Sequence, residues 1–216
     1  MRHSYTKISM YMECPAKKRY KYDERREILA SPAAQRGIDY HKQLEQLIVS
    51  PEPVVPTEQF TFYDGYLSRL RAIGAKAEYK FAVTRSWEPT TWDDENAWII
   101  GVADIWIPNG EGQLLAHVQD WKTGKIYDSH GKQGEFYATS LFSYVPEARE
   151  VKATFIYTDL RQERNTTYHR DQLDGLRARW TARIERMERD SQCVPTPGYG
   201  CRFCPFSKSK GGPCVF

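Results

Sequence analysis

Long hydrophobic runs are absent from this sequence. The longest apolar stretch covers residues 97–102, whereas about 20 apolar residues are needed to cross a bilayer. Residues 1–19 are polar and basic, without the apolar segment of a secretory signal. We therefore expect a cytoplasmic protein that does not contact a membrane.

A strong net charge is also missing. The 216 residues contain 31 Lys and Arg against 28 Asp and Glu, a net charge of +3. This balance does not require a nucleic acid partner, so any polyanion must be recognised by a local patch. There is no internal repeat and no low-complexity tract, and the length fits one domain.

Cysteine is scarce, with five residues. In a reducing compartment these thiols are expected to be metal ligands or buried free thiols rather than disulfides.

The hydrophobic pattern changes period along the chain. Helical spacing predicts helices over residues 6–22, 35–49, 63–73, 131–144 and 171–189. Alternation predicts a strand over residues 77–85, and further strands are expected over residues 97–108, 113–121, 151–158 and 163–170. Residues 97–107 are apolar on both faces, which places their strand at the centre of a sheet. A turn is expected at residues 108–112.

Two acids and a lysine lie in or beside apolar strands. Asp120 and Lys122 are two residues apart and so face the same side. Asp104 lies on the preceding strand, where a lone buried ion is costly. Grouped around a divalent cation, the three charges would stabilise one another. The alternative is that both acids lie at strand ends, with Lys122 solvated.

This grouping has a geometric condition. A hairpin centred on Gly110 would offset Asp104 from Asp120 by four residues, roughly 13 Å along the strand. The two carboxylates meet only if the turn is asymmetric or bulged.

Three polar residues on helices accompany this group. His41 faces the same way as Leu44, and a core histidine is the alternative interpretation. Gln133 and Tyr137 are four residues apart on a helix, so both can reach one site, although ordinary packing explains such a pair too.

The order of these motifs resembles the RecB-like branch of the PD-(D/E)XK nuclease superfamily. The matching residues are Ser9-Met10-Tyr11-Met12-Glu13-Cys14-Pro15 with Tyr20, Gly37-x-x-x-His41, Glu78, Gly101-x-x-Asp104, Asp120-Trp121-Lys122-Thr123-Gly124 and Gln133-x-x-x-Tyr137. The resemblance implies an α/β fold of the restriction-endonuclease type, a mixed β-sheet flanked by helices.

The same resemblance implies roles for the motif residues. Mg²⁺ or Mn²⁺ would be held by His41, Asp104, Asp120 and the main-chain carbonyl of Trp121. Lys122 would assist the attacking water. Gln133 and Tyr137 would support the site or contact DNA, and Glu78 matches an acidic position near the centre.

The implied activity is that of a metal-dependent DNA exonuclease. Its substrate would be single-stranded DNA or a free DNA end in recombination, repair or CRISPR adaptation, with a helicase, recombinase or CRISPR integrase as partner. The alternatives are a non-catalytic DNA-binding protein and a zinc-bound interaction module.

Cysteines near the C-terminus supply three thiolates for a metal site. Cys201-x-x-Cys204 and Cys214 occupy a Gly- and Pro-rich segment. A fourth thiolate from Cys193 would close a short loop, whereas Cys14 would join the two ends of the chain.

The resemblance favours Cys14. CRISPR-associated and helicase–nuclease members of the family hold a [4Fe–4S] cluster with one cysteine before the nuclease core and three after it. Residues 1–22 and 191–216 would then form a metal-cluster subdomain within one nuclease domain of residues 1–216. The gap between Cys204 and Cys214 is longer than usual in the family, so zinc stays an alternative.

A basic segment adjoins the first cysteine. Lys17, Lys18 and Arg19 are predicted to contact phosphate, with a solvated charge run as the alternative. If Cys14 and Cys201 share a cluster, these cations come close to those of the tail and to aromatic rings suited to base stacking. The further residues in this hypothesis are Lys21, Arg202, Lys208, Lys210, Tyr20, Tyr22 and Phe203.

Overall fold

The computed structural model describes residues 1–50, 56–108 and 115–216. These residues divide into two compact units, the first made of residues 1–2 and 31–177 and the second of residues 3–30 and 178–216. Most of the predicted turn at residues 108–112 lies outside the described part. None of the described helices combines the length and the apolar character needed to cross a membrane.

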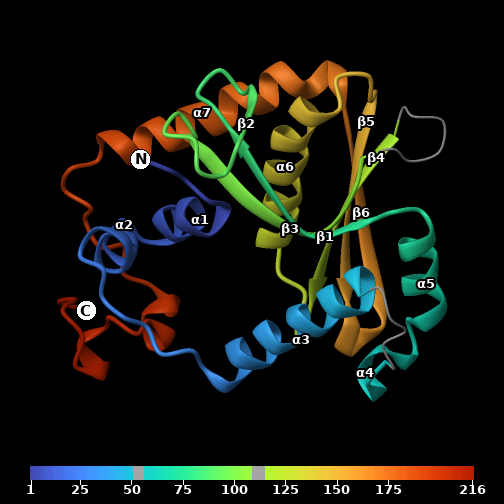
Figure 1. The fold of residues 1–216 in the computed structure, drawn as a ribbon. Coiled ribbons are helices and arrows are strands. Elements are labelled where there is room, and N and C mark those ends of the chain that lie inside the picture. The colour runs from blue at the N-terminus through green and yellow to red at the C-terminus, as the bar shows by residue number, and fades with distance from the viewer. Residues whose placement is uncertain (51–55, 109–114) are drawn as a thin grey trace. The chain divides into compact units, whose positions relative to one another are not determined.

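The first unit is built on a mixed six-stranded sheet (Figure 1). The strand order is β2-β1-β3-β4-β5-β6, in which β4 and β5 are parallel and the other neighbours antiparallel. The strands are β1 (Lys76–Val83), β2 (Pro89–Thr90), β3 (Ile99–Ile107), β4 (Leu115–Lys122), β5 (Glu150–Tyr157) and β6 (Gln162–His169). The predicted fold class is confirmed, and β3 is an inner strand as expected.

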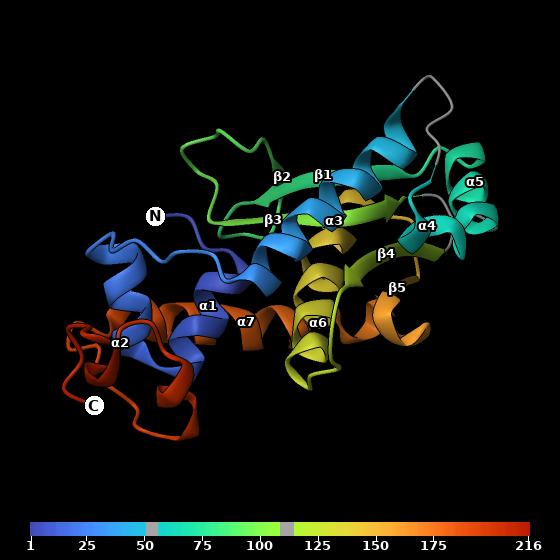
Figure 2. The ribbon, with the colours of Figure 1, turned by 90° about the horizontal axis from the view of Figure 1, so that it is seen from below.

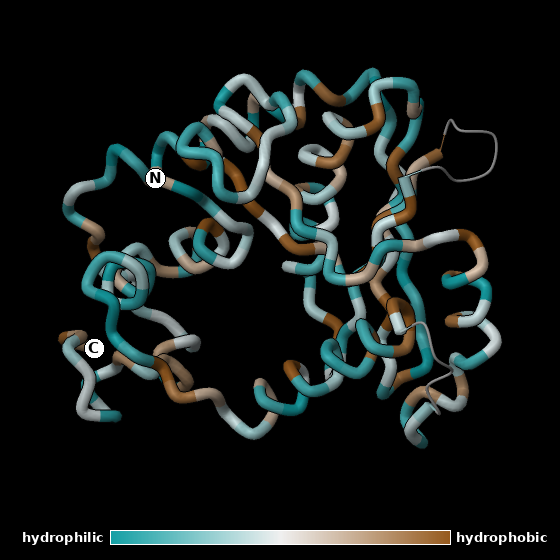
Figure 3. Tube along the Cα trace, viewed as in Figure 1, coloured by the Kyte–Doolittle hydropathy of each residue, from teal (hydrophilic) through white to brown (hydrophobic). Residues whose placement is uncertain are grey.

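Helices cover both faces of this sheet (Figure 2). Helix α6 (Ser129–Leu141) packs against β5, where a side chain at Gly134 would touch Ala153 and Phe155. The opposite face carries a core formed by α3 (Pro32–Val49), α4 (Glu58–Thr61), α5 (Asp64–Ala72) and inward residues of the strands. Figure 3 shows hydrophobic residues along the central strands, as this layered arrangement requires.

The register between β3 and β4 decides where the acids lie. Ile105 pairs with Gln119, and Ile107 pairs with His117. The ladder ends at the Ile105–Gln119 pair, and Asp104 and Asp120 follow it directly on their two strands. The two carboxylates are close enough to interact electrostatically, so they meet as the grouping requires.

The second unit contains the N-terminal helices. They are α1 (Tyr5–Glu13), α2 (Pro15–Lys18) and the π-helix η1 (Arg19–Asp23). Residues 6–22 are therefore helical as predicted except at Cys14, where the helix is interrupted. Cys14 is extended, with φ −158° and ψ 111°, because the ring of Pro15 disfavours a helical conformation in the residue before it.

The C-terminal part of the second unit begins within α7 (Leu173–Arg189). Trp180, Ile184 and Met187 form its predicted buried stripe, and the Trp180 ring meets the Tyr5 ring edge-on at 6.3 Å. Two short 3₁₀ helices follow, η6 (Tyr199–Phe203) and η7 (Lys208–Lys210).

Candidate active site

Two acids face each other across β1 and β3. The pairs Ala77–Ile105 and Tyr79–Ala103 flank Glu78 and Asp104 on either side. Glu78 has a left-handed backbone, with φ +46°. A non-glycine residue in this region is strained by about 1–3 kcal/mol, and such strain concentrates at functional sites.

Three side chains form a candidate metal site. Nδ1 of His41 lies 3.1 Å from Oδ1 of Asp104. The ligand atoms of His41, Glu78 and Asp104 all lie within 4.8 Å of one another. Carboxylate oxygens are the donors that Mg²⁺ and similar hard cations prefer, so this set fits a divalent cation.

The other oxygen of Asp104 is fixed by the neighbouring strand. The main-chain N–H of Trp121 donates to Oδ2 of Asp104 at 2.6 Å. This bond is fully buried and orients the carboxylate toward His41. The predicted ligand role of the Trp121 carbonyl stays a prediction.

The remaining motif residues lie around Asp120. The Lys122 ammonium lies 3.1 Å from its Oδ1 and also contacts Oδ2. The Gln133 amide donates to the same Oδ1 at 3.1 Å and to the Tyr137 hydroxyl at 2.8 Å. Residues of β4 and α6 thus converge as the sequence suggested.

The electrostatics of this group indicate excess negative charge in a buried setting. Burial raises the pKa of Asp120, and Asp104 adds to the rise although Lys122 opposes it. Burial and Asp104 likewise raise the pKa of Glu78. Burial lowers the pKa of Lys122 and of His41, but nearby carboxylates outweigh it and the net pKa of both is raised. A divalent cation would relieve this imbalance.

Gly101 of the same motif has a packing role. A Cβ atom at this position would lie 2.1 Å from the Phe81 ring. Any side chain here would force the Phe81 ring out of its position.

Sequence reasoning missed Asp159, which follows β5. Its carboxylate accepts two hydrogen bonds from Arg36, at 2.9 and 2.6 Å, and one from the Gly124 N–H at 2.9 Å. The adjacent Thr158 hydroxyl donates to the Lys122 carbonyl at 3.2 Å. Asp159 therefore links the helix that carries His41 to the loop after Lys122. No local sequence signal marks such a long-range contact.

Four cysteines of the second unit line one cavity of about 160 Å³. They are Cys14, Cys201, Cys204 and Cys214. The N–H of Thr196 donates to the Cys14 sulfur, and the N–H of Gly198 donates to the Cys201 sulfur, each at 3.4 Å. Hydrogen bonds to sulfur are also a feature of metal–thiolate sites.

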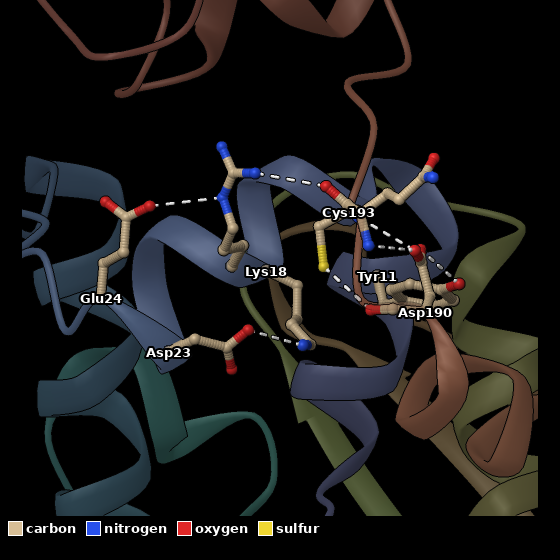
Figure 4. A network of polar contacts seen from close by, with 8 residues as sticks. Tyr11, Lys18, Asp23, Glu24, Asp190 and Cys193 are labelled. Carbon is tan, nitrogen blue, oxygen red and sulfur yellow. Dashed lines mark hydrogen bonds and ion pairs between the residues drawn. The ribbon is translucent and has the colours of Figure 1, made fainter.

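Cys193 is not part of this cavity lining. Its thiol is buried and donates to the Asp190 carbonyl at 3.4 Å (Figure 4). Burial raises the pKa of this thiol, which disfavours the thiolate. The short loop to Cys193 therefore does not bring it to the other cysteines.

The basic segment at residues 17–19 is largely neutralised. Lys17 pairs with Glu13 at 2.8 Å and Arg19 with Glu24 at 3.3 Å. Lys18 is buried and pairs with Asp23 at 2.8 Å (Figure 4). Its burial argues against the predicted phosphate contact for Lys18, because a buried, paired ammonium does not reach a surface ligand. Tyr20 is also buried, against Phe206, so it forms no exposed ridge.

Solved structures share this fold. The crystal structure of SSO0001 matches with a TM-score of 0.57 and 18% identity, covering 99% of this chain and 85% of the other. A protein from Eubacterium rectale described as a candidate exonuclease matches with a TM-score of 0.57 and 12% identity, covering 99% and 88%. No curated protein matches the sequence.

A family model completes the comparison. The model of the PD-(D/E)XK nuclease superfamily matches residues 2–209, which include every motif residue of the site. This chain belongs to the PD-(D/E)XK nuclease superfamily.

Proposed function

We propose that this protein is a Mg²⁺- or Mn²⁺-dependent DNA exonuclease that acts at DNA ends, with single-stranded DNA as its substrate. The observation that carries the proposal is the convergence of His41, Glu78, Asp104 and Asp120 beside the Lys122 ammonium. The E. rectale protein, described as a candidate exonuclease, supports the end-directed activity. Recombination, repair or CRISPR adaptation is the proposed setting, with a helicase, recombinase or CRISPR integrase as partner.

The residues divide the chemistry among them. His41, Glu78 and Asp104 would hold the cation, and Asp120 keeps its predicted ligand role, although its oxygens lie outside the 4.8 Å group that the other three form. A cation bound there would supply positive charge to the scissile phosphate and acidify a water molecule. Lys122 has a raised pKa and stays protonated, so it orients the attacking water and stabilises charge that develops on the phosphate.

Cleavage of end-labelled DNA tests this function directly. We expect single strands labelled at either end to be shortened when Mg²⁺ or Mn²⁺ is added and to stay intact in EDTA. Circular single-stranded DNA serves as the control, because it has no end and should resist an exonuclease. Metal-loaded protein that binds but never cuts would instead be a DNA-binding protein.

We also propose that the four cysteines of the cavity hold a [4Fe–4S] cluster. The four cysteines line one cavity of about 160 Å³, and this volume supports a group larger than a single ion. Its role would be to fix a segment with little apolar core.

Asp159 gives a prediction for the active site. Asp159→Asn removes the charge that holds Arg36, so the helix with His41 and the loop after Lys122 lose a common anchor. We expect the Mn²⁺ concentration for half-maximal cleavage to rise about tenfold, as for other residues that orient metal ligands. The free energy of unfolding should change little, because the ion pair between Asp159 and Arg36 is largely exposed to solvent.

The matched control is Asp39→Asn, the same charge change on α3. The Asp39 carboxylate accepts a hydrogen bond from Gln35 of its own helix. Direct Mn²⁺ binding followed by electron paramagnetic resonance separates affinity from rate. Equal Mn²⁺ affinity in both variants and the wild type would remove Asp159 from the positioning of the site.

A further inference from the structure

The positive charge of the chain is concentrated in the second unit. Residues 3–30 and 178–216 contain 14 Lys and Arg against 7 Asp and Glu, a net charge of +7. The first unit, with 17 basic and 21 acidic residues, has a net charge of −4. The mild overall charge therefore conceals a strongly basic unit that does not carry the carboxylates of the active site.

Within this unit, helix η6 presents different side chains to two sides. Cys201, together with Cys204 just after the helix, lines the cysteine cavity. Tyr199 and Phe203 are 74% and 65% exposed, with ring centroids 5.7 Å apart. The Arg202 guanidinium lies 5.7 Å from the centre of the Tyr199 ring. We call Tyr199, Arg202 and Phe203 the aromatic patch.

Cations without acidic partners accompany the aromatic patch. Lys208 and Lys210, on η7, are exposed. Within residues 1–50, 56–108 and 115–216, no carboxylate lies within 4.0 Å of the charged groups of Arg202, Lys208 or Lys210. They differ in this respect from residues 17–19, whose charges are paired within the unit.

Exposed rings beside unpaired cations suit one class of ligand. Aromatic rings stack on unpaired bases, and neighbouring Lys and Arg contact the phosphates that join them. Bases in a duplex are already stacked on one another, so such rings favour single strands. We propose that the aromatic patch, with Lys208 and Lys210, binds single-stranded DNA separately from the catalytic carboxylates. The choice of DNA as ligand rests on the proposed function.

The test is binding of a fluorescein-labelled oligothymidylate, followed by anisotropy without added divalent metal. We expect each of Tyr199→Ala and Phe203→Ala to weaken binding about tenfold, as loss of one stacked base does. Lys208→Ala/Lys210→Ala should lower the slope of log affinity against log salt by roughly 1.4, or about 0.7 per phosphate contact. Melting temperatures identify any variant that fails to fold.

Phe62→Ala is the matched control, because Phe62 is 60% exposed and has the Arg161 guanidinium 4.7 Å from its ring centre, but lies in the first unit. Wild-type affinity in folded Tyr199 and Phe203 variants would overturn the proposal, as would an equal loss in Phe62→Ala. If the wild type is a dimer and the Tyr199 and Phe203 variants are monomers, the patch is a self-association surface, and the DNA-binding proposal is overturned as well. Cleavage of the same oligonucleotide is measured in parallel. If the wild type cleaves DNA but the patch variants bind as tightly as it does, only the proposal for the aromatic patch is contradicted. If the wild type binds DNA through the patch but does not cleave it, only the proposed nuclease function is contradicted.

Discussion

Asp120→Asn is expected to lower the rate of DNA cleavage by about a thousandfold or more, a loss typical of removing a charged group that acts on the transition state. Asparagine keeps the shape and the hydrogen bond to Gln133 but removes the charge that the cation and Lys122 both need. Lys122→Met should cost about 10²- to 10⁴-fold, because no ammonium is left to orient the attacking water. Initial rates on end-labelled single strands measure both effects.

Two exposed neighbours provide matched controls. Asp128→Asn and Lys125→Met make the same chemical changes a few residues along the chain, at exposed positions. Both should cleave DNA at nearly the wild-type rate. If Asp120→Asn retains more than a tenth of the activity while its fold and Mn²⁺ content are intact, the proposed catalytic group is wrong.

Cys14→Ser is expected to remove most of the bound iron and sulfide from anaerobically prepared protein. The hydroxyl of serine is a poor substitute for a thiolate, and Cys14, between α1 and α2, is the one N-terminal cysteine in the cavity lining. The second unit should lose stability as well, since a structural metal group contributes folding free energy directly. Iron and sulfide analysis, visible absorbance and thermal unfolding follow these effects.

Cys193→Ser is the control for Cys14→Ser, because it removes a thiol that we do not expect to be a ligand of the cluster. Cys193 lies outside the cavity lining and its thiol bonds to Asp190, so this variant should keep its iron. Loss of iron in Cys193→Ser but not in Cys14→Ser would exchange their roles. Colourless wild-type protein with one zinc per chain, prepared without oxygen, would contradict the iron–sulfur proposal.

Much of the fold followed from short-range patterns. Alternating residues marked β1, and helical spacing marked α3 and α7, because these periods reflect which face of an element is buried. The same reasoning predicted that Asp120 and Lys122, two residues apart on a strand, point to the same side. A run of residues apolar on both faces marked β3 as an inner strand. Two errors had local causes: Pro15 ended the first helix early, and the two-residue strand β2 is too short to leave a pattern.

Other features depend on residues far apart in the sequence. Lys18 looked like a solvent-exposed cation, but in the folded protein its side chain is buried. Asp159 was indistinguishable from any other surface acid until Arg36 and Gly124 were placed beside it. The choice between Cys14 and Cys193 was likewise open, because loop length favoured one and resemblance the other.

The sequence by itself determined which chemical groups this protein has, on which faces of which elements they lie, and in what order they occur. Only the tertiary structure decided whether they meet. The register of β3 on β4 places Asp104 and Asp120 just beyond their last paired residues, close enough to interact electrostatically, and the strained backbone of Glu78 adds a third carboxylate. Both depend on pairing and packing energies summed over the whole sheet, which no single segment encodes.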